Sequence, residues 1–401
     1  MVCLLLAMLQ GLIPDITTII TRAVSLSVQC AGKISYTDLA WLHTDGRWIK
    51  DEQGNTVRFL GVGRLDMMVY YDDAHAPWGP QAVLKGMETE ANYDLLKSTG
   101  ANLLRLGLSR GAILENPQVL PLIDQIVAWC KERGIRVDFD LMWWTRNRPS
   151  NGSLDEWSEI VGPNPPQAWI DFFTMLAERY INEPTVCMFA LLNEPRFYKA
   201  VSLTTDEMLA IWKDRVTQVA KAIHRINPNL LISVNIPGFD LRKWESPSGI
   251  DYWIDEPNIV YAFHHYYRSD LIYWQPKWAT SYRDGNFDVA KQLYEQWMVQ
   301  RYFWVAEQRN LPVWMEESGV WLAETNYPNS LKVMWDAYQI LGNHSIGFAQ
   351  WVWNGEWNPR DPTTTLDQIS IDYSMLHYGQ TTLNEIGQQF ADYIATLQNI
   401  T

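Results

Sequence analysis

Eight short apolar runs, separated by segments of helical periodicity, constrain the fold of this chain more than any other feature. Runs of this length and composition indicate buried strands. They span residues 57–63, 102–107, 135–141, 186–192, 229–235, 258–263, 311–316 and 345–352. Helices are expected at 90–98, 122–130, 167–180, 206–226, 287–309, 329–341 and 382–397, and Gly134 is expected to end the second of them.

Strands that alternate with helices pair in parallel through right-handed crossovers. Eight of them close most economically into a (β/α)8 TIM barrel, an α/β fold built as a single domain. An open doubly wound sheet is the competing arrangement, and its phosphate-binding turn carries three glycines. Gly61-Val62-Gly63 is followed by Arg64-Leu65-Asp66 and lacks the third glycine. We therefore expect a barrel and no cofactor.

The chain before the first barrel strand contains two further features. Residues 42–55 hold two glycine-containing turns around a short strand, which predicts a β-hairpin lid. Residues 1–35 form an apolar segment, a candidate leader, ahead of a catalytic domain at 36–401. This segment lacks a basic start and a clear cleavage site, so a helix packed on the domain is the alternative. A secreted or cell-surface protein is expected, and an intracellular one if the segment stays.

Polar residues follow the predicted strands, where the active sites of such barrels lie. Asn193-Glu194-Pro195 comes directly after the apolar run Val186–Leu192. A similar triplet, Asn182-Glu183-Pro184, precedes the same strand and is interpreted as a turn. The other candidates at strand ends are Arg105, His264, His265, Tyr266, Tyr267, Glu316, Glu317, Trp351 and Trp353.

Two carboxylates on opposing strands, beside Arg, His, Tyr, Asn and Trp, are the groups needed to cleave a glycosidic bond. Retaining hydrolysis uses one carboxyl group as proton donor and a second as nucleophile, about 5 to 5.5 Å away. Arg105 and Tyr266 would keep an attacking carboxylate ionised. Asn193 is a candidate partner for the sugar 2-hydroxyl, and Trp351 for the floor under the ring.

Composition narrows the class of partner. The net charge of −14 argues against nucleic acid. The 21 Trp and 19 Tyr residues exceed what a core requires, and indole faces suit the apolar faces of sugar rings. Trp143 and Trp144, after the third strand, are candidate sugar platforms with Trp353. Further loop tryptophans that a long glycan would reach are Trp157, Trp274, Trp278, Trp321 and Trp357.

The sequence does not indicate a metal site, a membrane span or a disulfide framework. The pair His264-His265 lacks a third ligand at helical or turn spacing, so no metal is expected. No segment after the first 35 residues approaches a membrane span, and a monomer is expected. The scattered cysteines predict no disulfide framework; they are Cys3, Cys30, Cys130 and Cys187.

Several motifs in order resemble glycoside hydrolase family 5, the retaining cellulase and mannanase family, over residues 42 to 400. They are Leu-Leu-Asn193-Glu194-Pro, His264-x-Tyr266 after N-I-V-Y-A-F, P-V-W-M-E-Glu317-S-Gly319 and G-F-A-Q-Trp351. The resemblance implies that Glu194 is the general acid/base and Glu317 the nucleophile. It implies subsite roles for Arg105, Asn193, His264, Tyr266 and Trp351.

The neighbouring Glu316 must then have another role. Adjacent residues on a strand face opposite sides, so only one of the two glutamates should point into the barrel mouth. We expect Glu317 to do so, with Glu316 facing outward or bracing a loop.

The expected function is a retaining endo-β-1,4-glucanase that cleaves cellulose or another β-linked polysaccharide. Many family cellulases carry histidine after the third strand, in the sequence D-L-H, whereas this chain reads Asp140-Leu141-Met142. The thioether of Met142 cannot donate a hydrogen bond to a sugar hydroxyl. This departure favours the alternative of a β-1,4-mannanase. The sequence is also compatible with an enzyme for small glycosides and with a catalytically inactive glycan-binding barrel.

Overall fold

The computed structural model describes residues 39–64, 89–116, 118–144, 160, 166–195, 204–235, 253–267, 277–320, 329–353, 375–376 and 382–398. The chain divides into two units, Met1–Thr37 and Asp38–Thr401, and every described residue belongs to the second. The candidate leader at residues 1–35 therefore lies outside the described residues.

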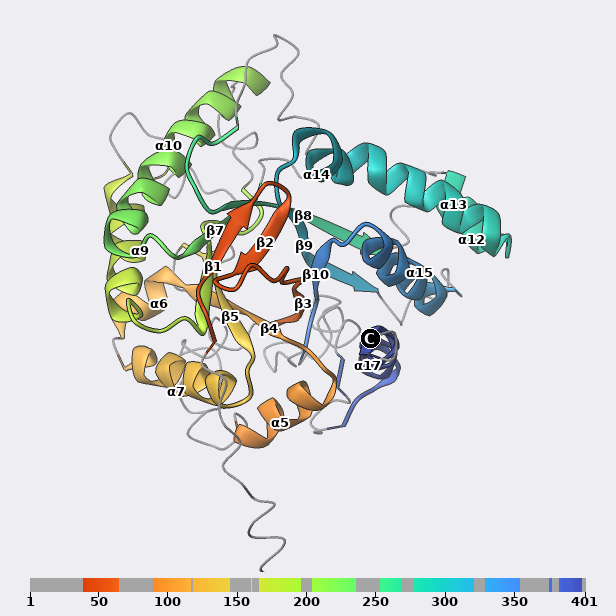
Figure 1. The fold of residues 1–401 in the computed structure, drawn as a ribbon, viewed down its shortest axis with the longest axis horizontal. Helices are drawn as coiled ribbons and strands as arrows, with labels where there is room; N and C mark the ends of the chain where they lie inside the picture. The colour runs from red at the N-terminus through yellow and green to blue at the C-terminus, as the bar shows by residue number, and fades with distance from the viewer. Residues whose placement is uncertain are drawn as a thin grey trace, which may run out of the picture. The chain divides into compact units, whose positions relative to one another are not determined.

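A closed barrel of parallel strands forms the body of this unit, in the spatial order β10-β3-β4-β5-β6-β7-β8-β9 (Figure 1). The predicted (β/α)8 TIM barrel is confirmed. Its strands are β3 (Leu60–Arg64), β4 (Leu103–Ser109), β5 (Arg136–Trp143), β6 (Val186–Ala190), β7 (Leu231–Asn235), β8 (Ile259–Tyr267), β9 (Val313–Val320) and β10 (Gly347–Gln350).

Helices connect the strands and cover the barrel. They are α5 (Glu90–Ser98), α6 (Arg110–Glu115), α7 (Val119–Glu132), α9 (Gln167–Arg179), α10 (Thr205–Ile226), α12 (Lys277–Arg283), α13 (Phe287–Met298), α14 (Trp304–Arg309), α15 (Ser330–Asn343) and α17 (Glu385–Gln398). Residues at the helix termini explain where several of these helices begin or end. Gly134, after α7, has a φ of +63°, a left-handed conformation that suits glycine. Thr204 and Glu207 form a reciprocal capping box at the start of α10.

The predicted elements differ from the observed ones mainly at their ends. β8 and β9 run several residues further than expected, because they pair with each other as far as Tyr267 and Val320. The single helix expected over 287–309 is interrupted by a π-helical segment, η3 (Val299–Phe303). Asn182-Glu183-Pro184 lies in the turn before β6, as predicted.

The N-terminal hairpin consists of β1 (Leu42–Asp45) and β2 (Trp48–Asp51), paired antiparallel. The Thr44 N–H donates to Asn258 Oδ1, and the Arg47 N–H donates to Asn310 Oδ1. Both asparagines precede barrel strands, so the hairpin covers the end of the barrel where strands begin. The predicted lid therefore closes the end of the barrel opposite the carboxyl ends of the strands.

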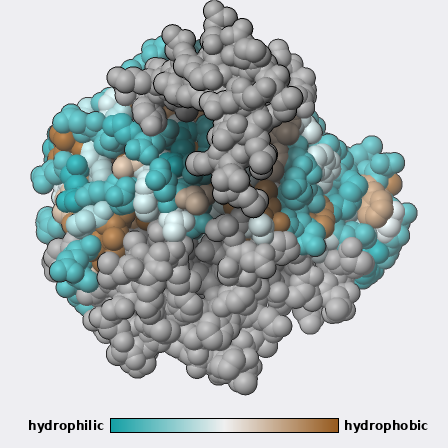
Figure 2. All heavy atoms as spheres, turned by 90° about the horizontal axis from the view of Figure 1, so that it is seen from below, coloured by the Kyte–Doolittle hydropathy of each residue, from teal (hydrophilic) through white to brown (hydrophobic). Residues whose placement is uncertain are grey.

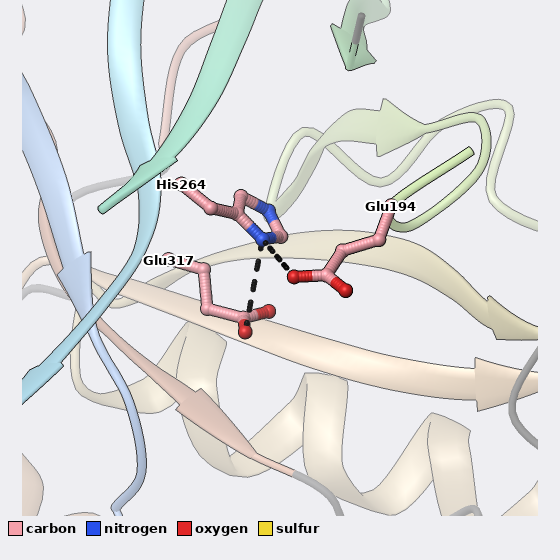
Figure 3. A group of neighbouring side chains, drawn as sticks. All are labelled: Glu194, His264 and Glu317. Carbon is pink, nitrogen blue, oxygen red and sulfur yellow. Dashed lines mark hydrogen bonds and ion pairs between the residues drawn. The ribbon is translucent and has the colours of Figure 1, made fainter. Parts of the chain in front are cut away.

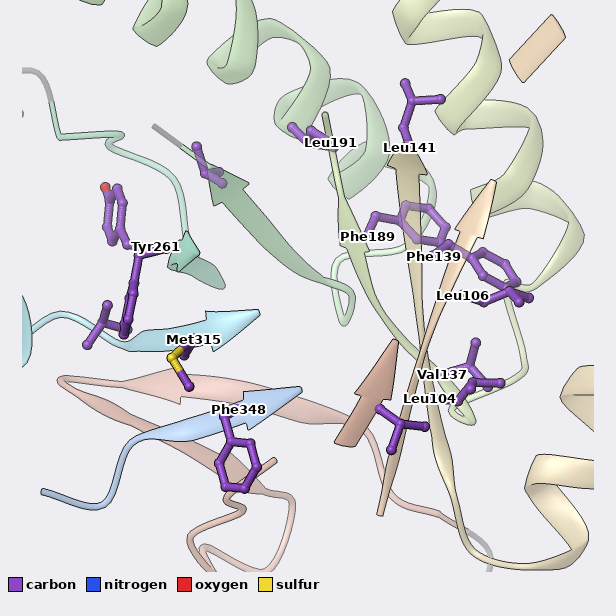
Figure 4. Close-up of a cluster of buried hydrophobic side chains, with 14 of the residues drawn as sticks. Leu104, Leu106, Val137, Phe139, Leu141, Phe189, Leu191, Tyr261, Met315 and Phe348 are labelled. Carbon is purple, nitrogen blue, oxygen red and sulfur yellow. The ribbon is translucent and has the colours of Figure 1, made fainter. Parts of the chain in front are cut away.

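Two apolar clusters fill the fold. The larger packs the outward side chains of the strands against the helices, and Figure 4 shows part of it, including Phe139, Phe189 and Phe348. The smaller lies inside the barrel and includes Leu103, Trp314 and the hairpin residue Leu42. Polar residues occupy inward positions further along the same strands. The barrel interior is therefore apolar near the hairpin and polar toward the carboxyl ends of the strands.

The visible surface of the described residues is mostly hydrophilic, with apolar residues scattered over it (Figure 2). The large apolar side chains that are exposed in the described part are Leu114, Ile181, Phe287 and Val289. None of the helices in the described ranges combines the length and apolarity needed to cross a bilayer.

One buried histidine lies outside the active-site region. His265, on β8, packs outward against the rings of Trp278, Tyr294, Trp297 and Tyr302. Burial, together with the nearby charge of Arg301, lowers the pKa of His265 to about 3. The ring is therefore neutral in the folded protein.

Acid should destabilise the fold through His265. Its folded-state pKa of about 3 lies below the ordinary value of 6.5, so between these values the unfolded chain binds the extra proton. The contribution of His265 to the free energy of unfolding therefore falls as the pH drops from about 6.5 toward 3, by at most about 1.4 kcal/mol per pH unit. His265→Phe should therefore lose less stability than wild type between pH 7 and pH 5, measured by urea denaturation. His43→Phe, at an exposed position in β1, is the control. A wild-type slope in His265→Phe would contradict the assignment.

Candidate active site

The carboxyl ends of β4, β6, β8 and β9 bring the predicted site residues together. His264 Nδ1 lies 3.0 Å from Glu194 Oε1 and 3.7 Å from Glu317 Oε1 (Figure 3). The facing atoms of Glu194, His264 and Glu317 all lie within 4.8 Å of one another. Two carboxyl groups that are distant in sequence thus come within the separation typical of a retaining pair.

Glu317 is held by two donors. Arg105 Nη1 donates to its Oε2 at 2.7 Å, and the Tyr266 hydroxyl donates to its Oε1. The residue is only 5% exposed. These contacts stabilise negative charge on this carboxylate and fix its orientation.

Glu194 follows β6 in a different environment. Its side chain is 24% exposed, and its backbone has a φ of +45°. A left-handed conformation is unfavourable for glutamate, and the following Pro195 disfavours it as well. Such backbone strain is concentrated at functional sites, where the surrounding structure maintains it.

Two buried tryptophans hold the strand ends beside the site. Trp169 Nε1 donates to the Leu191 carbonyl at 2.9 Å, and Trp212 Nε1 donates to the Asn235 carbonyl at 3.0 Å. The two rings stack with centroids 5.6 Å apart. Both tryptophans are core residues, and Trp169 positions the chain just before Asn193.

Arg105 is buried and joins several groups of the site. Its Nη2 donates to Asn193 Oδ1 at 2.7 Å and lies 2.9 Å from Asp140 Oδ2. Burial opposes its charge, but Asp140, Glu316 and Glu317 outweigh burial and raise its pKa. Arg105 is therefore a permanent cation inside the barrel.

Asp138 and Asp140 are site residues that the sequence analysis missed. Both lie on inward positions of β5 and are fully buried. Burial raises the pKa of Asp140 to about 8 against the opposing charge of Arg105, and it raises the pKa of Asp138 well above its usual range. The alternation V-D-F-D-L was the available signal, since it places both acids on one face of the strand.

The expectation that Glu316 faces outward is wrong. Glu316 is 1% exposed, and its carboxylate contacts Ser233 and His264 inside the barrel. The register of β9 shifts at this point, with Phe263 opposite Met315 but His264 opposite Glu317. A β-bulge inserts one extra residue, so strict alternation fails and both glutamates point inward.

The predicted aromatic platforms separate into different groups. Trp351 is partly exposed, and a methyl group added at Gly63 would lie 2.7 Å from its ring, so this glycine makes room for it. Trp144 and Trp353 are each 1% exposed and belong to the outer core, as does Trp278. They offer no free ring face, so these three predictions are corrected to core positions. The Trp143 side chain and Trp157, Trp274, Trp321 and Trp357 lie outside the described residues.

The Glu194, His264 and Glu317 cluster has a spacing that metal ligands can adopt. Sequence spacing could not reveal it, because the three residues come from different strands. Both Glu317 oxygens, however, accept hydrogen bonds from Arg105 and Tyr266. Burial would lower the pKa of His264, but Glu317, Glu194 and Glu316 raise it to about 10, and a ligating imidazole must be unprotonated. These groups suit hydrogen bonding better than metal binding.

A parallel barrel with paired carboxyl groups at the carboxyl ends of its strands is typical of barrel glycoside hydrolases. The sequence model of the Cellulase family, glycosyl hydrolase family 5, matches residues 51–356. The match covers most of the chain, and the chain therefore belongs to glycosyl hydrolase family 5. The resemblance inferred from the motifs is confirmed.

Relatives of this chain include proteins named as endoglucanases and one named as a mannan endo-1,4-beta-mannosidase. An endoglucanase from Paenibacillus polymyxa is 28% identical over 254 residues, which are 56% of this chain and 60% of that protein. Endoglucanase G from Acetivibrio thermocellus is 23% identical over 52% of this chain and 44% of its own length. The mannan endo-1,4-beta-mannosidase 2 of Arabidopsis thaliana is 24% identical over 51% of each chain. The chain thus spans about half the length of these relatives.

Solved structures share the fold at low identity. A beta-glucanase from Saccharophagus degradans superposes with a TM-score of 0.63 at 17% identity, covering 90% of this chain and 94% of that one. An endocellulase from Pyrococcus horikoshii gives a TM-score of 0.61 at 16% identity, covering 89% of this chain and 99% of that one.

Proposed function

We propose that this protein is a retaining endo-β-1,4-glucanase. The observation that carries the proposal is the pair Glu194 and Glu317, whose facing atoms lie within 4.8 Å. Inverting enzymes hold their carboxyl groups about 6.5–9.5 Å apart to admit a water molecule, whereas retaining enzymes hold them about 5–5.5 Å apart. Both carboxyl groups are present and paired, which favours an enzyme over an inactive glycan-binding barrel.

The environments of the two groups support different roles. Glu317, with Arg105 and Tyr266 bonded to its oxygens, is suited to attack the anomeric carbon as a carboxylate. Glu194, the more exposed, is suited to protonate the departing glycosidic oxygen. After the glycosyl–Glu317 ester forms, Glu194 takes a proton from water, and the resulting hydroxide equivalent releases the sugar with its configuration retained.

Neighbouring residues would bind the sugar at the point of cleavage. Asn193 Oδ1 accepts from Arg105 at 2.7 Å, which leaves the Asn193 amide group to donate to the sugar 2-hydroxyl. This contact strengthens as the transition state forms. The partly exposed ring of Trp351 is suited to lie under the sugar.

The endoglucanases among the relatives support a β-glucan substrate. A mannan substrate is the second candidate, supported by the Arabidopsis mannosidase and by Met142, which stands where many family cellulases carry histidine. A glucanase and a mannanase would both use Glu194 and Glu317 for cleavage. They would differ in the sugar that the site binds.

Replacing Glu317 should remove the nucleophile. Glu317→Gly should abolish hydrolysis, and azide should restore cleavage by direct attack, giving a glycosyl azide of inverted configuration detected by NMR. Glu316→Gly is the matched control on the neighbouring residue and should show no rescue. Rescue confined to Glu316→Gly would identify Glu316 as the nucleophile instead.

Replacing Glu194 should affect substrates according to their leaving groups. Glu194→Ala should slow polymer cleavage by about 10²- to 10⁴-fold, because the departing oxygen no longer receives a proton. An aryl cellobioside with an acidic phenol needs little protonation, so its glycosylation step should be much less affected. Equal losses on both substrates, in steady-state kinetics, would argue against the acid/base role.

The substrate is tested by comparing product release from carboxymethyl cellulose, lichenan, glucomannan, mannan, xylan and an aryl cellobioside. An endoglucanase should cleave the two β-glucans fastest and release β-anomers first, as followed by NMR. Cleavage of mannan without β-glucan would select the mannanase. Cleavage of the aryl glycoside alone would indicate a small-glycoside enzyme, and early α-anomers would contradict retention.

A further inference from the structure

Glu316 is a buried carboxylate for which double displacement has no direct use. Its Oε2 accepts from Ser233 Oγ at 2.7 Å, and its Oε1 lies 3.2 Å from His264 Nε2. Arg105 Nη2 is 3.7 Å from the same Oε1. Burying a charged group is unfavourable unless partners compensate it, and such groups are frequent at functional sites.

The anchoring of Glu316 begins in the inner core. Trp314 Nε1 donates to Ser233 Oγ at 3.0 Å, which leaves the Ser233 hydroxyl proton to bond Glu316. Trp314 and Ser233 are 1% and 0% exposed. The carboxylate therefore has a fixed position below the reactive pair.

His264 lies between two glutamates. Its Nδ1 is 3.0 Å from Glu194 Oε1, and its Nε2 is 3.2 Å from Glu316 Oε1. An ionised carboxylate only accepts hydrogen bonds, and a neutral imidazole carries one N–H. When both glutamates are ionised, both contacts are therefore satisfied if each ring nitrogen carries a proton.

We propose that Glu316 is a positioning residue that keeps His264 doubly protonated, so that its Nδ1–H donates to the acid/base Glu194. This inference rests on the proposed retaining function. As Glu194 gives its proton to the departing oxygen, negative charge develops on its carboxylate. A cationic donor already in place 3.0 Å away stabilises that charge without reorganisation.

The surroundings of His264 contain several other charged or titratable groups. Arg105 comes from β4, Asp140 from β5, Tyr266 from β8 and Glu317 from β9. Asn235, from β7, places its amide Nδ2 3.2 Å from Nε2, and a protonated Nε2 requires the flipped amide, which presents Oδ1 as an acceptor. Burial lowers the pKa of His264, and the surrounding glutamates raise it to about 10. Since Asp140 has a pKa raised to about 8, it also titrates in the alkaline range. A test must therefore observe the His264 ring directly.

The experiment compares wild type with Glu316→Gln, which keeps the shape of the side chain and removes its charge. The ring nitrogens of His264 are followed by ¹⁵N NMR and assigned by their loss in His264→Gln. In wild type both should stay protonated to at least pH 9, and in Glu316→Gln the ring should lose its proton about one to three pH units lower. At pH values where the ring is neutral in Glu316→Gln but cationic in wild type, kcat on lichenan should be lower in the variant, because the Nδ1–H donor to Glu194 is no longer assured.

Glu256→Gln is the matched control, because Glu256 Oε2 lies 3.9 Å from His224 Nδ1 in a glutamate–histidine pair outside the site. It should leave the His264 titration and the pH profile unchanged. Glu316→Asp, which restores a carboxylate, should recover much of the wild-type titration.

An unchanged His264 titration in Glu316→Gln would overturn the proposal, as would a shifted titration with no loss of kcat at the pH values where only the variant ring is neutral. If Glu316→Gln does not fold, a neutral His264 ring in wild type at pH 8 would overturn it, and a doubly protonated ring would support it. The NMR measurement requires no activity. A wild-type protein that cleaves no glycan would therefore refute the proposed function while the contact between Glu316 and His264 is still tested.

Discussion

The buried guanidinium of Arg105 is the group on which the geometry of the site depends. It lies 2.7 Å from Glu317, 2.7 Å from Asn193 and 2.9 Å from Asp140. An arginine in the interior is stable only with partners for its donors, and its planar group sets the directions in which they must lie. Residues from β4, β5, β9 and the loop after β6 converge for this reason.

Two cations and two carboxylates lie close together inside the barrel. Arg105 and His264 are the cations, and they face Glu316 and Glu317. Burial raises the pKa of Asp138 and Asp140, which favours the neutral form of both carboxyl groups. The interior can thus hold more carboxyl groups than cations without a large excess of negative charge.

Much of the fold could be predicted because its signals are local. Apolar runs of strand length, helical periodicity and Gly134 gave the barrel and most element ends to within a few residues. The strand-end positions of Arg105, Glu194, His264 and Glu317 predicted that these residues would meet, because the carboxyl ends of parallel strands share one face. The prediction that Trp144 and Trp353 bind sugar was wrong, since a tryptophan after a strand can pack into the core between strands and helices as easily as it can face a ligand.

The sequence by itself determined the eight-stranded barrel and the residues that stand at its mouth, because hydrophobic periodicity and strand order follow from the chain alone. Only the tertiary structure decided what each of those residues touches. The bulge in β9 lets Glu317 point inward beside Glu316, and it depends on how β9 pairs with its neighbours rather than on any residue within it. The same holds for the distance between Glu194 and Glu317, which barrel closure sets across several strands.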